Sequence, residues 1–179
     1  MKKVLIISTS LRPNANSEIL AHETERGAKD AGHNVEFVTL KDKDIKFCKG
    51  CLACQKLGKC VIDDDANIIT EKMKNADVII WATPVYYYEM SGQMKVVIDR
   101  ANSLFCSDYN FREIYLITTS ADSSNGVVQT VINGVNAWIS CFNNVKLCGY
   151  VEGSALENPN DAAKHKDLLD KAYNMGMNI

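Results

Sequence analysis

The sequence predicts a single α/β domain in which a doubly wound, five-stranded parallel sheet is the middle of three layers. Two observations support this prediction. Short apolar runs alternate five times with segments of helical period along residues 1–179, which is typical of repeated strand–helix–strand units. The runs are nearly continuous in apolar residues, as expected of strands covered on both faces. The chain shows no linker, internal repeat or low-complexity tract, so we expect one domain.

Five apolar runs are expected to form the strands. They cover residues 3–8, 35–40, 77–83, 114–119 and 145–151, and Pro84 is expected to end the third. In sheets of this kind the ligand crevice lies at the carboxyl ends of the strands. We therefore expect the chemistry in the loops that follow them.

Segments of helical period follow the strands, at residues 16–32, 63–76, 91–105, 128–142 and 158–176. Gly32 is a typical helix stop, and Asp63–Asp65 places negative charge where a helix N-terminus favours it. Asn158 and Pro159 are expected to be an N-cap followed by proline at the first helical position.

Charge and hydropathy exclude several classes of partner. The chain has 20 Lys+Arg and 22 Asp+Glu, a net charge of −2, which gives no basic surface for nucleic acid or for an anionic membrane. No apolar run approaches the roughly 18 residues of a membrane span. The run after Met1–Lys3 is shorter than the roughly 7–15 residues of an export signal. We expect a cytoplasmic protein that binds neither nucleic acid nor membrane.

The loop after the first strand, residues 8–17, has the composition of a phosphate site. It is rich in hydroxyl and amide side chains, contains Arg12, and opens a helix. Helix N-termini present unpaired N–H groups to anions. The loop lacks the glycine pattern of dinucleotide and Walker sites, which favours a monophosphate. The alternative is a polar turn that only caps the helix.

The loop after the third strand, residues 83–92, contains three consecutive tyrosines, Tyr86 to Tyr88. An aromatic crevice loop beside a phosphate site suits a flat conjugated ring, which needs an apolar wall and a few hydrogen bonds at its edge. The alternative is an aromatic surface patch used for packing between subunits.

Seven cysteines are divided between one window and three scattered positions. Cys106, Cys141 and Cys148 lie singly among apolar residues and are expected to be small buried hydrophobes. The others, in a loop expected at 46–62, are Cys48, Cys51, Cys54 and Cys60. Four thiolates in such a loop can converge on one [4Fe–4S] cube. The alternatives are a structural zinc site, a dithiol redox site and four thiols that bind no metal.

These motifs, taken in order, resemble a known family. Thr9-Ser10-Leu11-Arg12 through Asn16-Ser17, then Pro84-Val85-Tyr86, Met90 to Lys95 and Asp99-Arg100, are similar to the NADPH-dependent FMN reductase group of flavodoxin-like proteins. The cysteine window followed by Asp63-Asp64 resembles the iron–sulfur flavoprotein branch of that group. The resemblance extends from the first strand to about residue 150. Two departures are Thr9, where the family usually has glycine, and Ser120-Ala121-Asp122, where it often has glycines.

The resemblance implies a flavodoxin-like fold with FMN at the loops after strands one, three and four. The residues implied for the 5′-phosphate are Ser10, Arg12, Asn16 and Ser17. Those implied for the isoalloxazine wall are Pro84, Val85, Tyr86 and Tyr87, with Thr119 and Ser120 at its polar edge. It also implies a homodimer, or a dimer of dimers, with the flavin near the interface.

We therefore expect an FMN-dependent oxidoreductase that uses NAD(P)H or reduced ferredoxin to reduce small acceptors, with or without a [4Fe–4S] cluster. The flavin carries the reaction, so no side chain is named as a catalytic acid, base or nucleophile. The competing classes are a non-enzymatic electron carrier and a cluster-free NAD(P)H:FMN or quinone reductase. NADH and NADPH are not distinguished, because no separate nucleotide motif is present.

Overall fold

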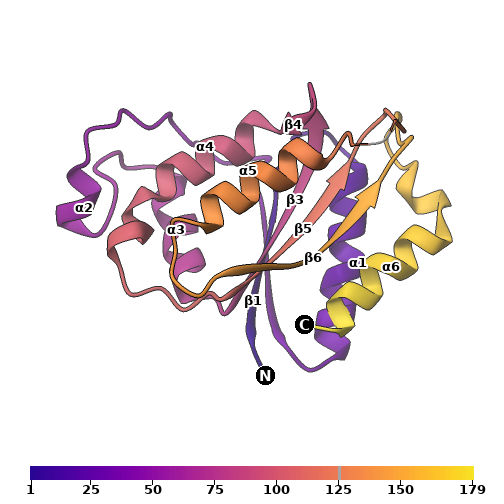
Figure 1. Cartoon of the computed structure of the whole chain (residues 1–179), viewed down its shortest axis with the longest axis horizontal. Coiled ribbons are helices and arrows are strands. Elements are labelled where there is room, and N and C mark those ends of the chain that lie inside the picture. Colours follow the sequence, from indigo (N-terminus) through magenta and orange to yellow (C-terminus); the bar gives the residue numbers. More distant parts are fainter. Residues whose placement is uncertain (125) are drawn as a thin grey trace.

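The computed structural model describes residues 1–124 and 126–179, and a parallel sheet runs through its centre (Figure 1). The strand order is β2-β1-β3-β5-β6, and every neighbouring pair is parallel. The strands are β1 (Lys3–Ser8), β2 (Asn34–Thr39), β3 (Val78–Tyr86), β5 (Glu113–Thr119) and β6 (Lys146–Gly153). The predicted α/β fold, with a five-stranded parallel sheet as its middle layer, is confirmed.

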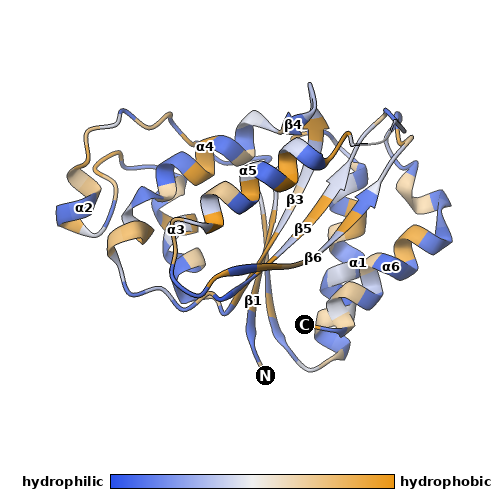
Figure 2. Cartoon of the chain, viewed as in Figure 1, coloured by the Kyte–Doolittle hydropathy of each residue, from blue (hydrophilic) through white to orange (hydrophobic). Residues whose placement is uncertain are grey.

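Helices cover both faces of the sheet. Helices α1 (Asn16–Asp30) and α6 (Lys166–Met177) pack on one face, and α3 (Asp65–Asn75), α4 (Gly92–Arg100) and α5 (Gln129–Ile139) pack on the other (Figure 1). Each face has its own apolar core, one around Ile6 and Ile80 and the other around Ile79 and Trp81. Figure 2 shows hydrophobic residues gathered where the strands cross the centre of the molecule, while the helices carry both hydrophobic and hydrophilic residues. This burial is the main source of stability.

Helices α1 and α6 cross at two glycines. A Cβ atom at Gly27 would lie 2.1 Å from the carbonyl oxygen of Tyr173, and one at Gly176 would lie 2.1 Å from that of Thr24. No side chain fits at either position, because the obstructing atoms belong to backbone. The crossing therefore fixes the position of α1, whose first turn faces the carboxyl ends of the strands.

Strand β3 continues past Pro84, so the prediction that proline ends it is wrong. Strand β1 pairs with β3 only as far as Ala82, so Pro84 lies beyond that ladder, where a missing N–H is tolerated. A two-residue turn at Tyr87 and Tyr88, with φ of 50° and 63°, then returns the chain as the short strand β4 (Glu89–Met90). Positive φ is costly for a bulky side chain, so the sequence gives no signal for this hairpin.

The last helix begins at Lys166 and not at Pro159 as predicted. The side chain of Asn16 accepts a hydrogen bond from Ala162 N at 3.0 Å and donates to Asn158 O at 2.9 Å. These contacts hold the segment in a turn, which leads into a short 3₁₀ helix, η2 (Ala162–Lys164). A tertiary contact therefore overrides a local capping signal.

Two further elements differ from the predicted ones. The helix expected over 91–105 is α-helical only to Arg100 and continues as a 3₁₀ helix, η1 (Ala101–Cys106). The cysteine window contains a short helix, α2 (Ala53–Leu57). None of the helices in the described residues is both long enough and apolar enough to cross a bilayer.

The prediction that the scattered cysteines are buried is wrong. Cys106, Cys141 and Cys148 are all exposed. Cys106 ends η1, Cys141 follows the end of α5, and Cys148 lies on the edge strand β6 beside a register shift. The ends of helices and the edge of a sheet leave side chains in solvent even when their sequence neighbours are apolar.

Candidate functional site

A cavity of about 190 Å³ lies at the carboxyl ends of β1, β3 and β5. It is enclosed by the loop after β1, the first turn of α1, the end of β3, the loop after β5, and Leu156 and Glu157 after β6. The residues proposed from sequence that line it are Ser10, Arg12, Asn16, Ser17, Pro84, Val85, Tyr86, Thr119 and Ser120. Segments distant in sequence therefore meet where the parallel fold predicts a ligand crevice.

Tyr87 is the one proposed flavin residue that does not line this cavity. Its side chain lies at the tip of the β3–β4 turn and is fully exposed, with a relative solvent accessibility of 101%. The neighbouring Tyr88 donates from its hydroxyl to Asp122 Oδ2 at 2.9 Å. Tyr88 therefore joins the hairpin to the loop after β5, while Tyr87 projects into solvent.

The hydroxyl of Ser17 is the clearest sign of a ligand in the cavity. It is buried in the first turn of α1 and has no hydrogen-bond partner among the described residues. Leaving a buried hydroxyl unpaired costs about 1–3 kcal/mol, so such groups call for an explanation. An anion with acceptor oxygens would satisfy the hydroxyl, and the N–H groups of a helix's first turn favour negative charge at the same place.

Arg12 lies on the outer side of the cavity. Its guanidinium is exposed and donates to Glu157 O at 3.0 Å, and its backbone N–H donates to Ser10 Oγ at 3.3 Å. A single neutral carbonyl is a weak partner for a guanidinium, which binds a phosphate through charge-assisted bonds. Arg12 is therefore placed to exchange this contact for one to an anion.

The side chain of Asn16 has a structural role. Both amide protons are used, by Leu156 O at 3.2 Å and Asn158 O at 2.9 Å, and its oxygen accepts from Ala162 N. This leaves its backbone N–H for a ligand. The amide joins the loop after β6 to the start of α1, which closes one wall of the cavity.

Thr9 occupies the position where the family described above usually has glycine, and its side chain points away from the cavity. Its hydroxyl donates to Ala82 O at 3.0 Å and lies 3.0 Å from Ser91 Oγ. The side chain is completely buried. The departure from glycine therefore leaves the cavity open, because the threonine side chain packs against β3 and the start of α4.

The four cysteines of the window line a second cavity, of about 400 Å³. Cys48 and Cys51 are exposed, whereas Cys54 and Cys60 are half-buried. Gly50 and Gly58 both have positive φ, of 64° and 71°, so the loop uses the backbone freedom of glycine to turn around the cavity. Figure 1 shows this loop and α2 at the opposite end of the molecule from α6.

The thiols do not form a closed ligand set as they stand. Within residues 1–124 and 126–179, no three His, Cys, Asp or Glu side chains are grouped closely enough to hold a metal ion. The chemistry of the donors nevertheless fits an iron–sulfur cube, which needs four thiolates, and all four share one cavity. The loop would have to draw its thiols together around such a group.

A buried ion pair supports the cysteine loop, and sequence reasoning, which considered an ion pair at Asp99-Arg100, missed Asp64 as the partner of Arg100. Arg100 and Asp64 have no exposed side-chain surface, and both Asp64 oxygens accept from the guanidinium. Burial raises the pKa of Asp64, but hydrogen bonds from Arg100 and from the N–H groups of Lys46 and Ala66 lower it further, so that it lies below its usual range. Asp99, which adjoins Arg100 in sequence, pairs instead with Lys95 at 2.7 Å.

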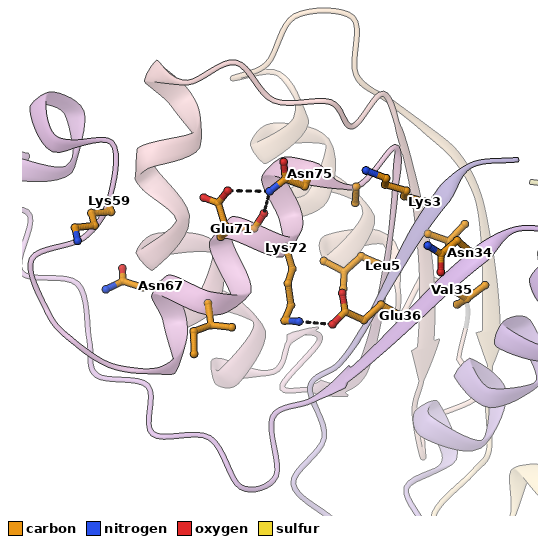
Figure 3. A pocket seen from close by; sticks show the side chains of 13 residues that line it. Lys3, Leu5, Asn34, Val35, Glu36, Lys59, Asn67, Glu71, Lys72 and Asn75 are labelled. Carbon is orange, nitrogen blue, oxygen red and sulfur yellow. Dashed lines mark hydrogen bonds and ion pairs between the residues drawn. The ribbon is translucent and has the colours of Figure 1, made fainter.

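A larger cavity, of about 890 Å³, is not a candidate site (Figure 3). It lies beside the amino ends of β1 and β2, where Lys3 and Asn34 line it, and ligands of parallel sheets bind at the carboxyl ends. Two pairs of its labelled polar side chains bond to each other, Lys72 with Glu36 and Asn75 with Glu71. It contains none of the proposed site residues.

Comparison with known proteins identifies relatives along most of the chain. The family model for NADPH-dependent FMN reductase matches residues 2–138. An iron–sulfur flavoprotein of Methanocaldococcus jannaschii is 30% identical over 183 residues, which cover 99% of this chain and 95% of the relative. An iron–sulfur flavoprotein of Methanosarcina thermophila is 32% identical over 138 residues, covering 76% of this chain and 72% of the relative.

Solved structures agree on the fold. The NAD(P)H:quinone oxidoreductase of Methanothermobacter marburgensis superposes with a TM-score of 0.75 at 14% identity, covering 99% of this chain and 98% of the other. An azoreductase of Bacillus anthracis also gives 0.75, at 15% identity, with both chains fully covered. At such low identity these likenesses show the fold alone. The match of the family model over residues 2–138, together with the relative matched along nearly the whole chain, shows that the chain belongs to the NADPH-dependent FMN reductase family.

Proposed function

We propose that this chain is an FMN-dependent oxidoreductase that takes electrons from NAD(P)H or a reduced ferredoxin and passes them to small acceptors such as quinones or flavins. Membership of the family supports the enzyme class. The observation that carries the FMN site is the unpaired hydroxyl of Ser17 inside the cavity at the strand ends. FMN supplies the transfer of electrons when bound, and the protein supplies binding, orientation and electrostatics.

Different parts of the cavity would bind the phosphate and the ring of FMN. Ser17 and the first-turn N–H groups of α1 would bind the phosphate, and Arg12 would add a charge-assisted contact from the rim. A volume of about 190 Å³ is below the roughly 300–1,000 Å³ of pockets that enclose a whole drug-sized ligand. The cavity would therefore enclose the phosphate end, and Pro84, Val85 and Tyr86 would hold the ring at the open rim.

Thr119 and Ser120 lie at and just after the end of β5, where Thr119 pairs with Pro84 of the neighbouring strand, and both line the cavity. The hydroxyl of Ser120 donates to Asp122 O at 2.7 Å, so it shapes its own loop, and Ser120 N–H donates to Gly153 O. Thr119 is therefore the freer of the two side chains to reach the polar edge of the ring.

We propose further that Cys48, Cys51, Cys54 and Cys60 hold one [4Fe–4S] cluster. Three observations support this: the shared cavity, the relatives named as iron–sulfur flavoproteins, and the glycines that let the loop turn. A cluster-free reductase is the competing function, and the open arrangement of the thiols favours it.

Homodimer formation and a cytoplasmic location are also proposed. The exposed Tyr87 and an apolar cavity of about 540 Å³ between α4 and α5, lined by Gly134, Ala137 and Trp138, support contact with a second copy. Exposed apolar side chains on the cysteine loop, Phe47 and Leu52 among them, offer a further surface for a dimer of dimers. All seven cysteines are free thiols, which suits a reducing compartment.

One preparation tests the proposed FMN site, the proposed cluster and the proposed reaction together. Protein purified without oxygen is measured for FMN released by heat, for iron and sulfide, and for steady-state oxidation of NADH and NADPH with a quinone acceptor. We expect one FMN per chain and turnover with at least one nucleotide. Fully flavinated protein with negligible turnover would instead be an electron carrier. Flavin with no iron would leave the cluster-free reductase, and protein that binds no FMN would overturn the proposed site.

A further inference from the structure

One arginine closes the loop that carries the cysteines. Arg100 donates from Nη1 to Lys46 O at 2.7 Å and from Nη2 to Ile62 O at 3.1 Å. These carbonyls belong to the first and last residues of the loop at 46–62. The same two nitrogens also donate to the two oxygens of Asp64, which itself accepts from Lys46 N at 2.9 Å. Both ends of the loop are therefore fixed to one buried side chain.

The fifth donor of Arg100 is not used by this arrangement. A guanidinium has five N–H groups, and the four on Nη1 and Nη2 are taken by the contacts described. The Nε–H is buried and has no partner among the described residues. Arg100 lines the cavity that the four cysteines also line, so the free donor belongs to a side chain that faces the thiols.

Cys60 is the cysteine whose thiol acts on the charge of Arg100, and both residues line the same cavity. Asp64 is the main cause that raises the pKa of Arg100, burial opposes it, and the neighbouring Cys60 thiol, which lines the same cavity, raises it further. The positive charge therefore lies beside the Cys60 sulfur. The backbone of Cys60 is held as well, because Asn67 Nδ2 donates to its carbonyl at 3.2 Å.

Asn102, two residues after Arg100, supplies a second hydrogen-bond donor. Asn102 Nδ2 donates to Cys54 Sγ at 3.2 Å. Asn102 is the second residue of η1, which directly follows α4, and it lines the same cavity. The short segment from Arg100 to Asn102 thus donates from Asn102 to Cys54 Sγ, and it carries the unpaired Nε–H of Arg100 beside the cavity that Cys60 lines.

We propose that Arg100 and Asn102 are positioning residues that hold Cys60 and Cys54 and raise the reduction potential of the iron–sulfur group these thiolates bind. This inference rests on the proposed cysteine site. Reduction adds one electron to the group, with no bond made or broken and no proton transferred. Because the added charge is negative, hydrogen bonds to the sulfurs and a neighbouring guanidinium stabilise the reduced form more than the oxidised form.

The test compares variants of the intact, FMN-loaded protein prepared without oxygen. Asn102→Leu removes one donor at similar side-chain volume, and Arg100→Lys keeps the charge but loses the planar fork and the Nε–H. The midpoint potential is measured by titration with dithionite followed by electron paramagnetic resonance, alongside iron, sulfide and FMN content. Asn75→Leu and Arg26→Lys, at exposed sites outside the cysteine cavity, are the matched controls.

We expect Asn102→Leu to keep its iron and FMN and to shift the reduction equilibrium at least tenfold toward the oxidised form, which is about 59 mV for one electron. Arg100→Lys should shift it in the same direction and lose iron to a chelator several times faster than wild type, because both ends of the loop are loosened. The controls should match wild type. If Arg100→Lys does not fold, the potential of Asn102→Leu decides the proposal.

Two results would overturn the inference, and they are distinguishable. Wild-type protein that holds iron, with unchanged potential in Asn102→Leu and in folded Arg100→Lys, would reject the role of the two donors and leave the cysteine site standing. Wild-type protein that holds no iron would reject the cysteine site itself, and with it the group to be tuned. FMN content, measured in the same samples, is unaffected by either failure.

Discussion

Replacing Ser17 with alanine should change binding and stability in opposite directions. The hydroxyl is buried without a partner in the ligand-free protein, so its removal relieves a cost of desolvation. In the proposed FMN complex the same hydroxyl would donate to the phosphate, so its removal should delete a hydrogen bond to a charged group. A residue that served only the fold would not separate the two effects.

The magnitudes follow from the two environments. A hydrogen bond to a charged group contributes about 1.5–3 kcal/mol, so the dissociation constant of FMN should rise by roughly 10- to 150-fold at about 1.4 kcal/mol per factor of ten. An unsatisfied buried hydroxyl costs about 1–3 kcal/mol. The free energy of unfolding of the FMN-free protein should therefore increase by at least about 1 kcal/mol, or about 2–4 °C in melting temperature for a domain of this size.

The assay is FMN fluorescence quenching for affinity and urea unfolding of the FMN-free protein for stability. Thr118→Val is the matched control, because Thr118 Oγ1 is also buried without a partner and Thr118 does not line the cavity. It should stabilise the protein and leave FMN affinity unchanged. Unchanged affinity in Ser17→Ala, or a loss of stability in the FMN-free protein, would refute the assignment of Ser17 to the phosphate.

Further expectations concern the ion pair, the cysteines and the helix crossing. Asp64→Asn leaves the buried charge of Arg100 without its partner and should lower the free energy of unfolding by about 3–5 kcal/mol; a loss below about 1 kcal/mol in urea would contradict this. Because the pKa of Asp64 is held below its usual value of about 3.9, its contribution is fully present above that value and is lost as the pH falls through the lower folded pKa. The difference in unfolding free energy between wild type and Asp64→Asn should thus be constant from pH 7 to about 5 and shrink below about pH 4. A difference that grows as the pH falls would contradict the lowered pKa of Asp64. Cys51→Ala should lose iron and keep FMN, whereas the exposed Cys106→Ala should retain both, and equal iron in the two variants would count against the cluster. Gly27→Ala should destabilise the protein by about 3 kcal/mol or more, since its Cβ would lie 2.1 Å from Tyr173 O; thermal unfolding that matches wild type would show that the crossing can relax.

The fold was predictable because its signals are local. Continuous apolar runs identify strands buried on both faces, and the observed β1, β3 and β5 are buried along most of their length. The site followed from the fold, since parallel strands bring their following loops together. The particular side-chain roles did not follow: the amide of Asn16 is used by the segment around Asn158, more than a hundred residues away.

Features that depend on long-range contacts were not predictable. Asp64 and Arg100 lie 36 residues apart, and nothing in the sequence distinguishes Asp64 from its acidic neighbours as the partner of a buried arginine. The tyrosine turn is a second case, because the preferred residues for positive φ are glycine and asparagine. The run Asp63–Asp65 followed the cysteines closely enough to suggest a structural role, but only the fold shows which carboxylate is buried.

The closure of the cysteine loop by Arg100 bears on how such a chain can change over evolution. Lys46 and Ile62 are both held by one guanidinium. Residues inserted or deleted between them therefore do not alter the path of β2 before the loop or of α3 after it. For a flexible loop, doubling the length costs only about 0.6 kcal/mol in closure entropy. The spacing between Cys54 and Cys60 is thus free to drift among descendants of this chain, whereas Arg100 and Asp64 are not free to be replaced one at a time.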